Sequence, residues 1–175
     1  MKKTRKIGIS GKIQKVIISN TTPLINFSCI RRLDILAKLF SEIYIPFAVR
    51  EELQSKVHKF PTISLILESD FIKTLEIKNT QLVNSLRIDL HSGEAEAIVL
   101  AIENQNSFLL LDELAGRSIA RFQNLKFTGT IGCLLEAKRE NIISEIKPSL
   151  DLIQTNANFW ISEALYNQVL KDSNE

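Results

Sequence analysis

The sequence predicts an α/β fold in which a parallel sheet carries helices on both faces. Short apolar segments such as residues 16–19 and 108–111 alternate along the chain with segments whose apolar residues recur at helical spacing. Several of these short segments stop at polar residues or at a proline, as buried strands do. Strands that alternate with helices favour a parallel sheet, because parallel strands need a crossover connection.

The composition predicts one domain. With 175 residues, of which 45% are hydrophobic and 24% charged, the chain is long enough for a sizeable core but not for a second full domain. No run approaches the roughly 18 apolar residues of a membrane span, and no apolar signal segment adjoins the basic N-terminus. We therefore expect a soluble protein of the cytoplasm that does not bind a membrane.

The net charge of +2 is unevenly distributed. Residues 1–15 hold six basic residues and no acid, which leaves a net charge of −4 for residues 16–175. We expect residues 1–15 to form a basic N-terminal arm, either a solvated tail or a segment that adds affinity for phosphates. Residues 16–175 are expected to form the single domain.

Cysteine and histidine give no metal pattern. Cys29 and Cys133 have no partners at ligand spacing and are too few for a disulfide framework, so they are expected to be small buried hydrophobic residues. His58 and His91 are too isolated to predict a metal ligand.

The first strand, at residues 16–19, stops at Asn20, and Pro23 suits the first turn of the helix that follows. A second helix is predicted over residues 33–40 and a second strand over residues 43–45. The next elements are predicted as a helix from Pro46, a helix at 62–68, and a strand at 71–77 with a polar connection after it. A helix from Ser92 and a strand at 108–111 follow, then a helix at 114–122 and a strand at 126–128. The last helices are predicted at 130–139, capped by Thr130, at 149–155, and at 162–170, capped by Ser162.

Two carboxylates fall on buried helix faces. In the helix from Pro46, Glu52 lies within the arc of Val49 and Leu53. In the helix from Ser92, Glu94 points along the buried stripe. That stripe is predicted to be Ala97, Ile98, Ala101 and Ile102, and Glu96 and Glu103 fall on the opposite, solvated side.

Asp112 ends the apolar strand 108–111, so its carboxylate is expected at the carboxyl edge of the sheet, where open α/β sheets bind ligands. Asn20 and Glu94 are expected at the same edge, and Glu52 is close enough in the pattern to join them. Crowded oxygen ligands suit Mg²⁺ or Mn²⁺ better than zinc, and such ions serve phosphodiester hydrolysis. Taken singly, each acid is also explained by the helix dipole or by helix capping.

The order of elements, Glu94, Ala101 and the strand that ends in Asp112 resemble the PIN-domain superfamily of metal-dependent ribonucleases, which includes VapC-type toxins. The 18-residue step from Glu94 to Asp112 is similar to the spacing of the family's third and fourth acids. The chain resembles a PIN-like branch of unknown function more closely still. The motifs that carry this resemblance are SNTTPLI at 19–25, GEAEAI at 93–98, GR at 116–117 and TGTIG at 128–132. The resemblance covers residues 16–170 and implies a three-layer PIN-like fold.

By position, the resemblance implies that Asn20, Glu52, Glu94 and Asp112 take the places of the four catalytic and metal-binding acids. Asn20 departs from the pattern because its amide offers an oxygen without a negative charge. The resemblance also implies Glu113 as an outer metal ligand, and Thr22, Arg117 and Thr130 as substrate-binding residues. It further implies an RNA substrate, a small antitoxin protein as partner and a homodimer.

Aromatic residues are expected in the core rather than in base stacking. Phe27, Phe40, Phe108, Phe122 and Phe127 all sit within apolar patterns. Trp160 is expected to anchor the last helix.

Two functions remain open. One is a PIN-type endoribonuclease dependent on Mg²⁺ or Mn²⁺, as the toxin of a toxin–antitoxin pair. The other, favoured by Asn20, is a PIN-like module that binds RNA or protein and has lost its chemistry. Phosphatase or receiver-domain chemistry requires an aspartate nucleophile after the first strand. This chain has Asn20 there, which counts against that chemistry.

Overall fold

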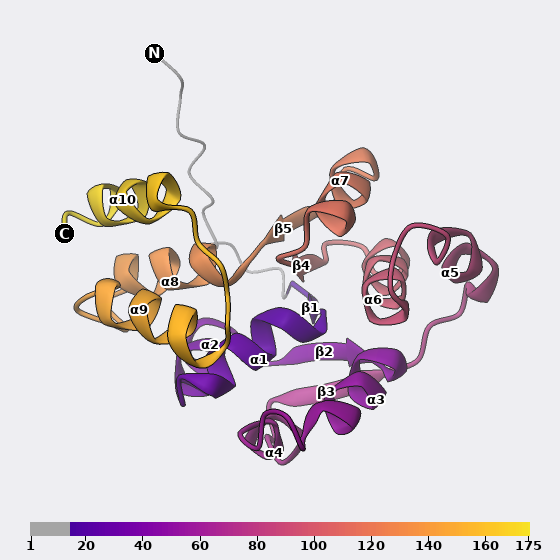
Figure 1. The fold of residues 1–175 in the computed structure, drawn as a ribbon. Coiled ribbons are helices and arrows are strands. Elements are labelled where there is room, and N and C mark those ends of the chain that lie inside the picture. The colour runs from indigo at the N-terminus through magenta and orange to yellow at the C-terminus, as the bar shows by residue number, and fades with distance from the viewer. Residues whose placement is uncertain (1–14) are drawn as a thin grey trace.

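A computed structural model describes residues 15–175 of the chain. Its centre is a five-stranded sheet in the order β3-β2-β1-β4-β5, and every neighbouring pair of strands is parallel (Figure 1). The strands are β1 (Ile17–Ser19), β2 (Ile43–Pro46), β3 (Ile72–Leu75), β4 (Phe108–Leu110) and β5 (Lys126–Thr128). The predicted parallel α/β fold is confirmed. The predicted basic arm lies outside the described residues, apart from Lys15.

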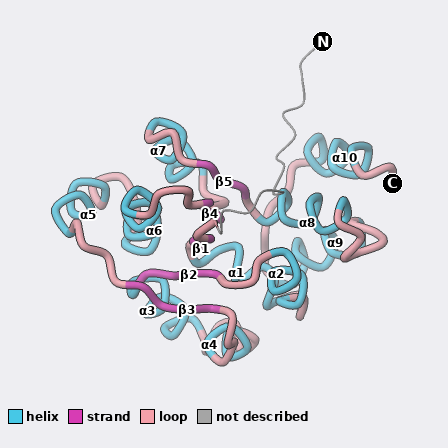
Figure 2. The backbone as a smooth tube through the Cα atoms, turned by 180° about the vertical axis from the view of Figure 1, so that it is seen from behind, coloured by secondary structure: helices cyan, strands magenta, loops and turns pink. Residues whose placement is uncertain are grey.

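Helices cover both faces of this sheet. They are α1 (Thr21–Cys29), α2 (Leu33–Leu39), α3 (Phe47–Lys56), α4 (Ile63–Leu67), α5 (Thr80–Leu86), α6 (Ser92–Glu103), α7 (Leu114–Phe122), α8 (Thr130–Arg139), α9 (Lys147–Asn156) and α10 (Glu163–Asp172). Figure 2 shows α5, α6 and α7 on one side and α2, α8, α9 and α10 on the other. The molecule therefore has three layers.

Each face of the sheet has its own hydrophobic cluster, because successive side chains of a strand point to opposite faces. Ile17 and Phe108 belong to one cluster, which α1 to α4 and α8 to α10 complete. Their neighbours Ile18 and Leu109 belong to the other, which α5, α6 and α7 complete. Both faces are buried, which explains why the central strands read as continuous apolar runs.

The order of the strands fixes where a site forms. From β1 the chain adds β2 and β3 on one side, then crosses back to add β4 and β5 on the other. Loops that leave β1 and β4 therefore diverge, and a crevice opens outside the carboxyl ends of these two strands. Asn20 follows β1 directly, and its backbone N–H donates to the carbonyl oxygen of Leu110 in β4 at 3.1 Å.

Some elements differ from their predictions. The strand predicted at 71–77 is the shorter β3, and part of the expected polar connection after it is α5, whose N-cap Asn79 accepts a hydrogen bond from the backbone N–H of Leu82 at 3.0 Å. The predicted N-cap Thr130 is wrong. Gly129 is the N-cap and Thr130 is the first residue of α8. The hydroxyl of Thr130 donates to Asp112 rather than capping the helix, where it would accept a hydrogen bond.

Three apolar residues predicted to be buried are exposed. Trp160 is 82% exposed and lies in the irregular connection between α9 and α10, where the flanking Phe159 and Ile161 pack against the core instead. Phe122, also 82% exposed, is the last residue of α7 and lies off the helix face that buries Gly116 and Ala120. Ile102 lies at the exposed end of α6.

The two acids assigned to the solvated side of α6 are half-buried hydrogen-bond acceptors. Glu96 accepts from the backbone N–H of Ala48 in the first turn of α3 at 3.0 Å. Glu103 accepts from the backbone N–H groups of Lys78 at 2.9 Å and Asn79 at 2.6 Å, just before α5. They therefore join α6 to its neighbours.

No described helix combines the length and the apolar character that crossing a lipid bilayer requires. Cys133 is buried as expected, whereas Cys29 is only partly buried.

Candidate functional site

A pocket of about 390 Å³ opens at the carboxyl ends of β1 and β4. It is lined by the ends of four elements, which contribute Asn20, Thr21, Thr22, Glu52, Lys56, His91, Glu94 and Glu113. Five residues that the sequence singled out, Asn20, Thr22, Glu52, Glu94 and Glu113, therefore meet around one cavity. Asp112, Arg117 and Thr130 do not line it.

Asn20 binds the carboxylate of Glu113. Its Nδ2 donates to Glu113 Oε2 at 2.6 Å, and the hydroxyl of Thr22 donates to Glu113 Oε1. An aspartate at position 20 would place two carboxylates against each other, whereas the amide donates a hydrogen bond. With its nitrogen engaged, Asn20 leaves its Oδ1 buried and without a partner.

Glu94 is buried in the first turn of α6, as its helical phase predicts. Its Oε2 accepts from the backbone N–H of His91 at 3.2 Å, and its Oε1 is buried without a partner. Desolvation raises the pKa of this carboxyl; the hydrogen bond from His91 opposes the rise, and the charge of Glu113 adds to it. Glu94 is thus a carboxylate held ready for a partner that the described residues do not supply.

Glu52 has both oxygens engaged. Its Oε2 accepts from Thr21 Oγ1 at 2.5 Å, and its Oε1 forms an ion pair with Lys56 Nζ at 2.5 Å. Sequence reasoning did not single out Thr21 or Lys56. The spacing of four residues between Glu52 and Lys56 on one helix was the signal that pointed to this pair.

Asp112 faces the opposite way, into the protein. Its Oδ1 accepts from the backbone N–H of Thr130 at 2.9 Å, its Oδ2 accepts from Thr130 Oγ1 at 2.6 Å, and Arg117 lies 3.6 Å away. The side chain is only 6% exposed, and desolvation raises its pKa against these hydrogen bonds. Arg117 also donates to the carbonyl oxygen of Leu111 at 2.8 Å, which directs it to the end of β4.

Thr130 is fully buried. Its hydroxyl accepts from Asn26 Nδ2 at 2.9 Å while it donates to Asp112. The structure therefore places Thr130 behind the site, where it orients Asp112.

Three glycines from neighbouring elements make room for the acids. A Cβ atom on Gly93 would lie 2.8 Å from Glu52 Oε2, and one on Gly116 would lie 3.2 Å from Glu94 Oε1. A Cβ atom on Gly129 would collide with Asp112 and Arg117. The pairs are Gly93 with Glu52, Gly116 with Glu94, and Gly129 with Asp112.

The donor set fits a hard cation such as Mg²⁺ or Mn²⁺. Within residues 15–175, the only buried side-chain nitrogen or oxygen atoms without a hydrogen-bond partner are Asn20 Oδ1 and Glu94 Oε1, both on residues that line the pocket. An unpaired buried acceptor costs free energy, and a bound cation removes that cost. No three His, Cys, Asp or Glu side chains of the described range form a ready metal cluster.

Residues 16–175 match a family model described as a PIN domain, which is nearly the whole chain. No curated protein and no solved structure gave a significant match.

Proposed function

The chain belongs to the PIN-domain family, and from this we propose that it is an endoribonuclease that depends on Mg²⁺ or Mn²⁺. The observation that carries the proposal is the pair of unpartnered oxygens, Asn20 Oδ1 and Glu94 Oε1, in an acidic pocket at the carboxyl edge of the sheet. Asn20, Glu94 and Glu113 would hold the ion there, and Asp112 supports the same edge from behind.

A divalent ion bound in such a pocket makes water a better nucleophile and stabilises negative charge on a phosphoryl group. Other residues of the chain hold the metal-binding side chains in position. Asn20 restrains the carboxylate of Glu113 in the pocket, and the backbone N–H of His91 fixes the carboxylate of Glu94. Thr130 holds Asp112. The reaction is hydrolysis, in which one water molecule cleaves a phosphodiester bond into a phosphate monoester and a hydroxyl group.

The test is cleavage of single-stranded RNA by the purified protein. We expect cleavage in Mn²⁺, none in EDTA, and loss of cleavage on Glu94→Gln. The matched control is Glu96→Gln on the same helix, because a glutamine oxygen still accepts the hydrogen bond from the N–H of Ala48. Cleavage that is unchanged when Glu94 and Asp112 are both replaced by alanine would remove both residues from the mechanism.

We further propose that the protein acts in the cytoplasm as the toxin of a toxin–antitoxin pair, as a homodimer neutralised by a small antitoxin protein. Its membership of the PIN-domain family supports this role. Expression in a host cell should then slow growth, and the product of an adjoining open reading frame should co-purify with the chain. Normal growth together with measurable ribonuclease activity would separate the enzyme from the toxin role.

A binding module without chemistry is the second candidate, and the hydrogen bond from Asn20 to Glu113 favours it. That bond occupies a carboxylate oxygen that would otherwise face a cation. This candidate predicts RNA binding that survives EDTA, no cleavage with any divalent ion, and no activity gained on Asn20→Asp. A gain of cleavage in Asn20→Asp would contradict it.

A further inference from the structure

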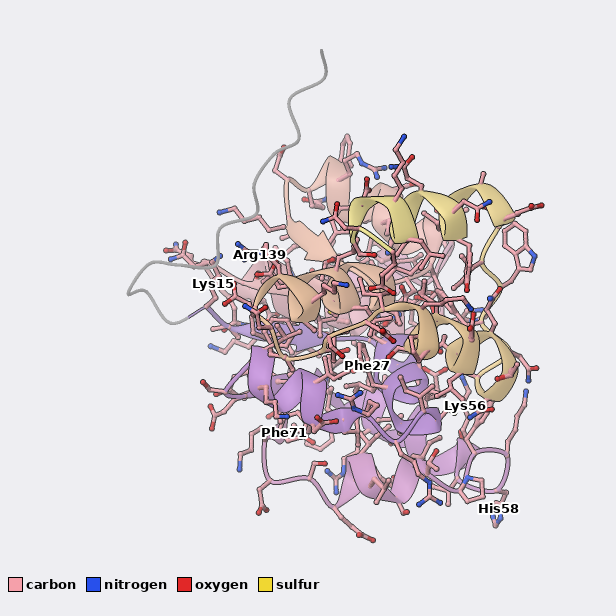
Figure 3. The ribbon with its side chains drawn as sticks, turned by 90° about the vertical axis from the view of Figure 1, so that its left-hand side faces the viewer. Lys15, Phe27, Lys56, His58, Phe71 and Arg139 are labelled. Carbon is pink, nitrogen blue, oxygen red and sulfur yellow. The ribbon has the colours of Figure 1, made fainter. Side chains whose placement is uncertain are left out.

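Lys56 brings a positive charge into the acidic pocket. Among the described residues that line the cavity, it is the one lysine or arginine. It is the last residue of α3, and its side chain is 40% exposed, so it is open to a ligand. In Figure 3, Lys56 lies on the side of the molecule opposite Lys15, which precedes β1 and marks the other end of the sheet.

Glu52 fixes the position of this ammonium group. The ion pair at 2.5 Å joins residues four apart on one helix, with the glutamate on the N-terminal side, which is the favourable order. The carboxylate is itself held by the hydroxyl of Thr21, and the absence of a side chain on Gly93 gives it room. Glu52 therefore serves as an anchor for Lys56. Its charge is compensated by the ammonium group, whereas Glu113 accepts only from the neutral donors Asn20 and Thr22.

The charges of the pocket require such a group. Three carboxylates and one ammonium line it, a net charge of −2 with His91 counted as neutral, which one divalent ion neutralises. Without Lys56, the three carboxylates and one divalent ion would keep a net charge of −1, which would repel the negative charge of a phosphodiester. An ammonium group has three N–H donors, and Glu52 accepts one of them, so two remain for phosphate oxygens.

We propose that Lys56 binds a non-bridging oxygen of the substrate phosphate, and that Glu52 positions Lys56 rather than binding the metal ion. The inference rests on the proposed function, because that function supplies the phosphodiester as the ligand. It assigns the two sides of the pocket different tasks: Asn20, Glu94 and Glu113 face the cation, and Lys56 faces the anion.

The first experiment measures Mn²⁺ binding by calorimetry without RNA. Lys56→Met removes a positive charge beside the acids and releases Glu52, so the Kd for Mn²⁺ should fall about fivefold. Glu52→Gln should raise that Kd only about fivefold, through the lost charge, whereas Glu94→Gln should raise it at least about 100-fold. The control is Lys59→Met, which removes an equal charge from an exposed lysine that does not line the pocket. A loss of Mn²⁺ binding in Glu52→Gln as large as that in Glu94→Gln would overturn the assignment of Glu52.

The second experiment measures binding of a short fluorescein-labelled single-stranded RNA with Ca²⁺ in place of Mn²⁺. Lys56→Met should weaken binding about tenfold, and Lys56→Arg, which keeps the charge, should weaken it by less than about threefold. Circular dichroism checks that each variant is folded, and Lys56→Gln, which also removes the charge, takes the place of Lys56→Met if that variant does not fold. RNA binding equal to that of the parent protein in Lys56→Met, with Lys59→Met unchanged as well, would overturn the proposal.

Cleavage kinetics separate this proposal from the proposed function. If the parent protein cleaves RNA in Mn²⁺, Lys56→Met should lower kcat/KM about 100-fold. If the parent cleaves no RNA, the ribonuclease assignment fails, and the binding measurements still judge Lys56. A parent protein that binds neither Mn²⁺ nor RNA contradicts both.

Discussion

Replacing Thr130 by valine tests how Asp112 is held in the protein. The hydroxyl of Thr130 donates to Asp112 Oδ2 at 2.6 Å and accepts from Asn26 Nδ2 at 2.9 Å. Valine has nearly the same shape but no hydroxyl, so one substitution removes both hydrogen bonds. The backbone N–H of residue 130 still donates to Asp112 Oδ1.

The expected loss of stability follows from these two bonds. A hydrogen bond to a charged group contributes about 1.5–3 kcal/mol, and a buried amide left without a partner costs about 1–3 kcal/mol. The buried hydroxyl is also replaced by a methyl group, which returns about 1 kcal/mol. We therefore expect Thr130→Val to lower the free energy of unfolding by about 2–4 kcal/mol at pH 7.

Urea unfolding followed by circular dichroism measures this difference. Thr130→Ser keeps the hydroxyl and is the matched control, with an expected loss of under about 1.5 kcal/mol. The pKa of Asp112 is raised by burial, so the carboxyl becomes neutral as the pH falls through that pKa, and the gap between Thr130→Val and the parent should narrow there. A loss below about 1 kcal/mol in Thr130→Val at pH 7, or an equal loss in both variants, would refute the reasoning.

Three further predictions concern Glu94, Asn20 and Glu175. Burial raises the pKa of Glu94, so the parent loses stability relative to Glu94→Gln as the pH rises from the unfolded-state pKa of this carboxyl toward its raised native pKa. Without metal, thermal unfolding at pH 7 should show a higher Tm for Glu94→Gln than for the parent, and a lower Tm for the variant would contradict this. Asn20→Asp sets a carboxylate against Glu113, so it should lower the Tm measured without metal. Mn²⁺ should raise the Tm of this variant more than it raises the Tm of the parent, and equal shifts would count against a cation site. Glu175 is partly desolvated, which opposes ionisation, but Lys138 and the backbone N–H groups at the start of α9 lower its pKa from 4.5 to about 2. The ionised Glu175 stabilises the folded protein above pH 4.5, and this stabilisation is lost as the pH falls toward 2. After allowance for solvent screening, Glu175→Gln should lower the free energy of unfolding in urea by about 1 kcal/mol at pH 7 and by almost nothing at pH 2.

The regular elements of the second half were predictable because their signals are local. The bounds of α7, β5 and α8 agree with the predicted ranges, since each apolar pattern is bounded by polar or turn-forming residues. Helix α5 was missed because, among its seven residues, only Val83 is buried. The apolar stripe of α5 is short, since it consists of Leu82, Val83 and Leu86, and the cap at Asn79 is a weaker signal than periodicity.

The site was predictable where helical phase decides direction. The burial of Glu94 follows from its position relative to the apolar residues of α6, and the structure confirms it. The direction of Asp112 was not predictable in this way, because it depends on the amide and hydroxyl of Thr130, 18 residues further along the chain. Likewise, no local pattern in the sequence reveals that the amide of Asn20 donates to Glu113, 93 residues further along the chain.

The glycines that adjoin the acids have a consequence for protein engineering. Each of Gly93, Gly116 and Gly129 lies on a different segment from the carboxylate it accommodates, so the acids and their space are encoded far apart in the chain. Grafting the acids alone onto another parallel sheet would therefore give side chains with nowhere to lie. A successful transplant has to carry the glycines as well, and its smallest unit is a pair of residues, an acid and the missing side chain beside it.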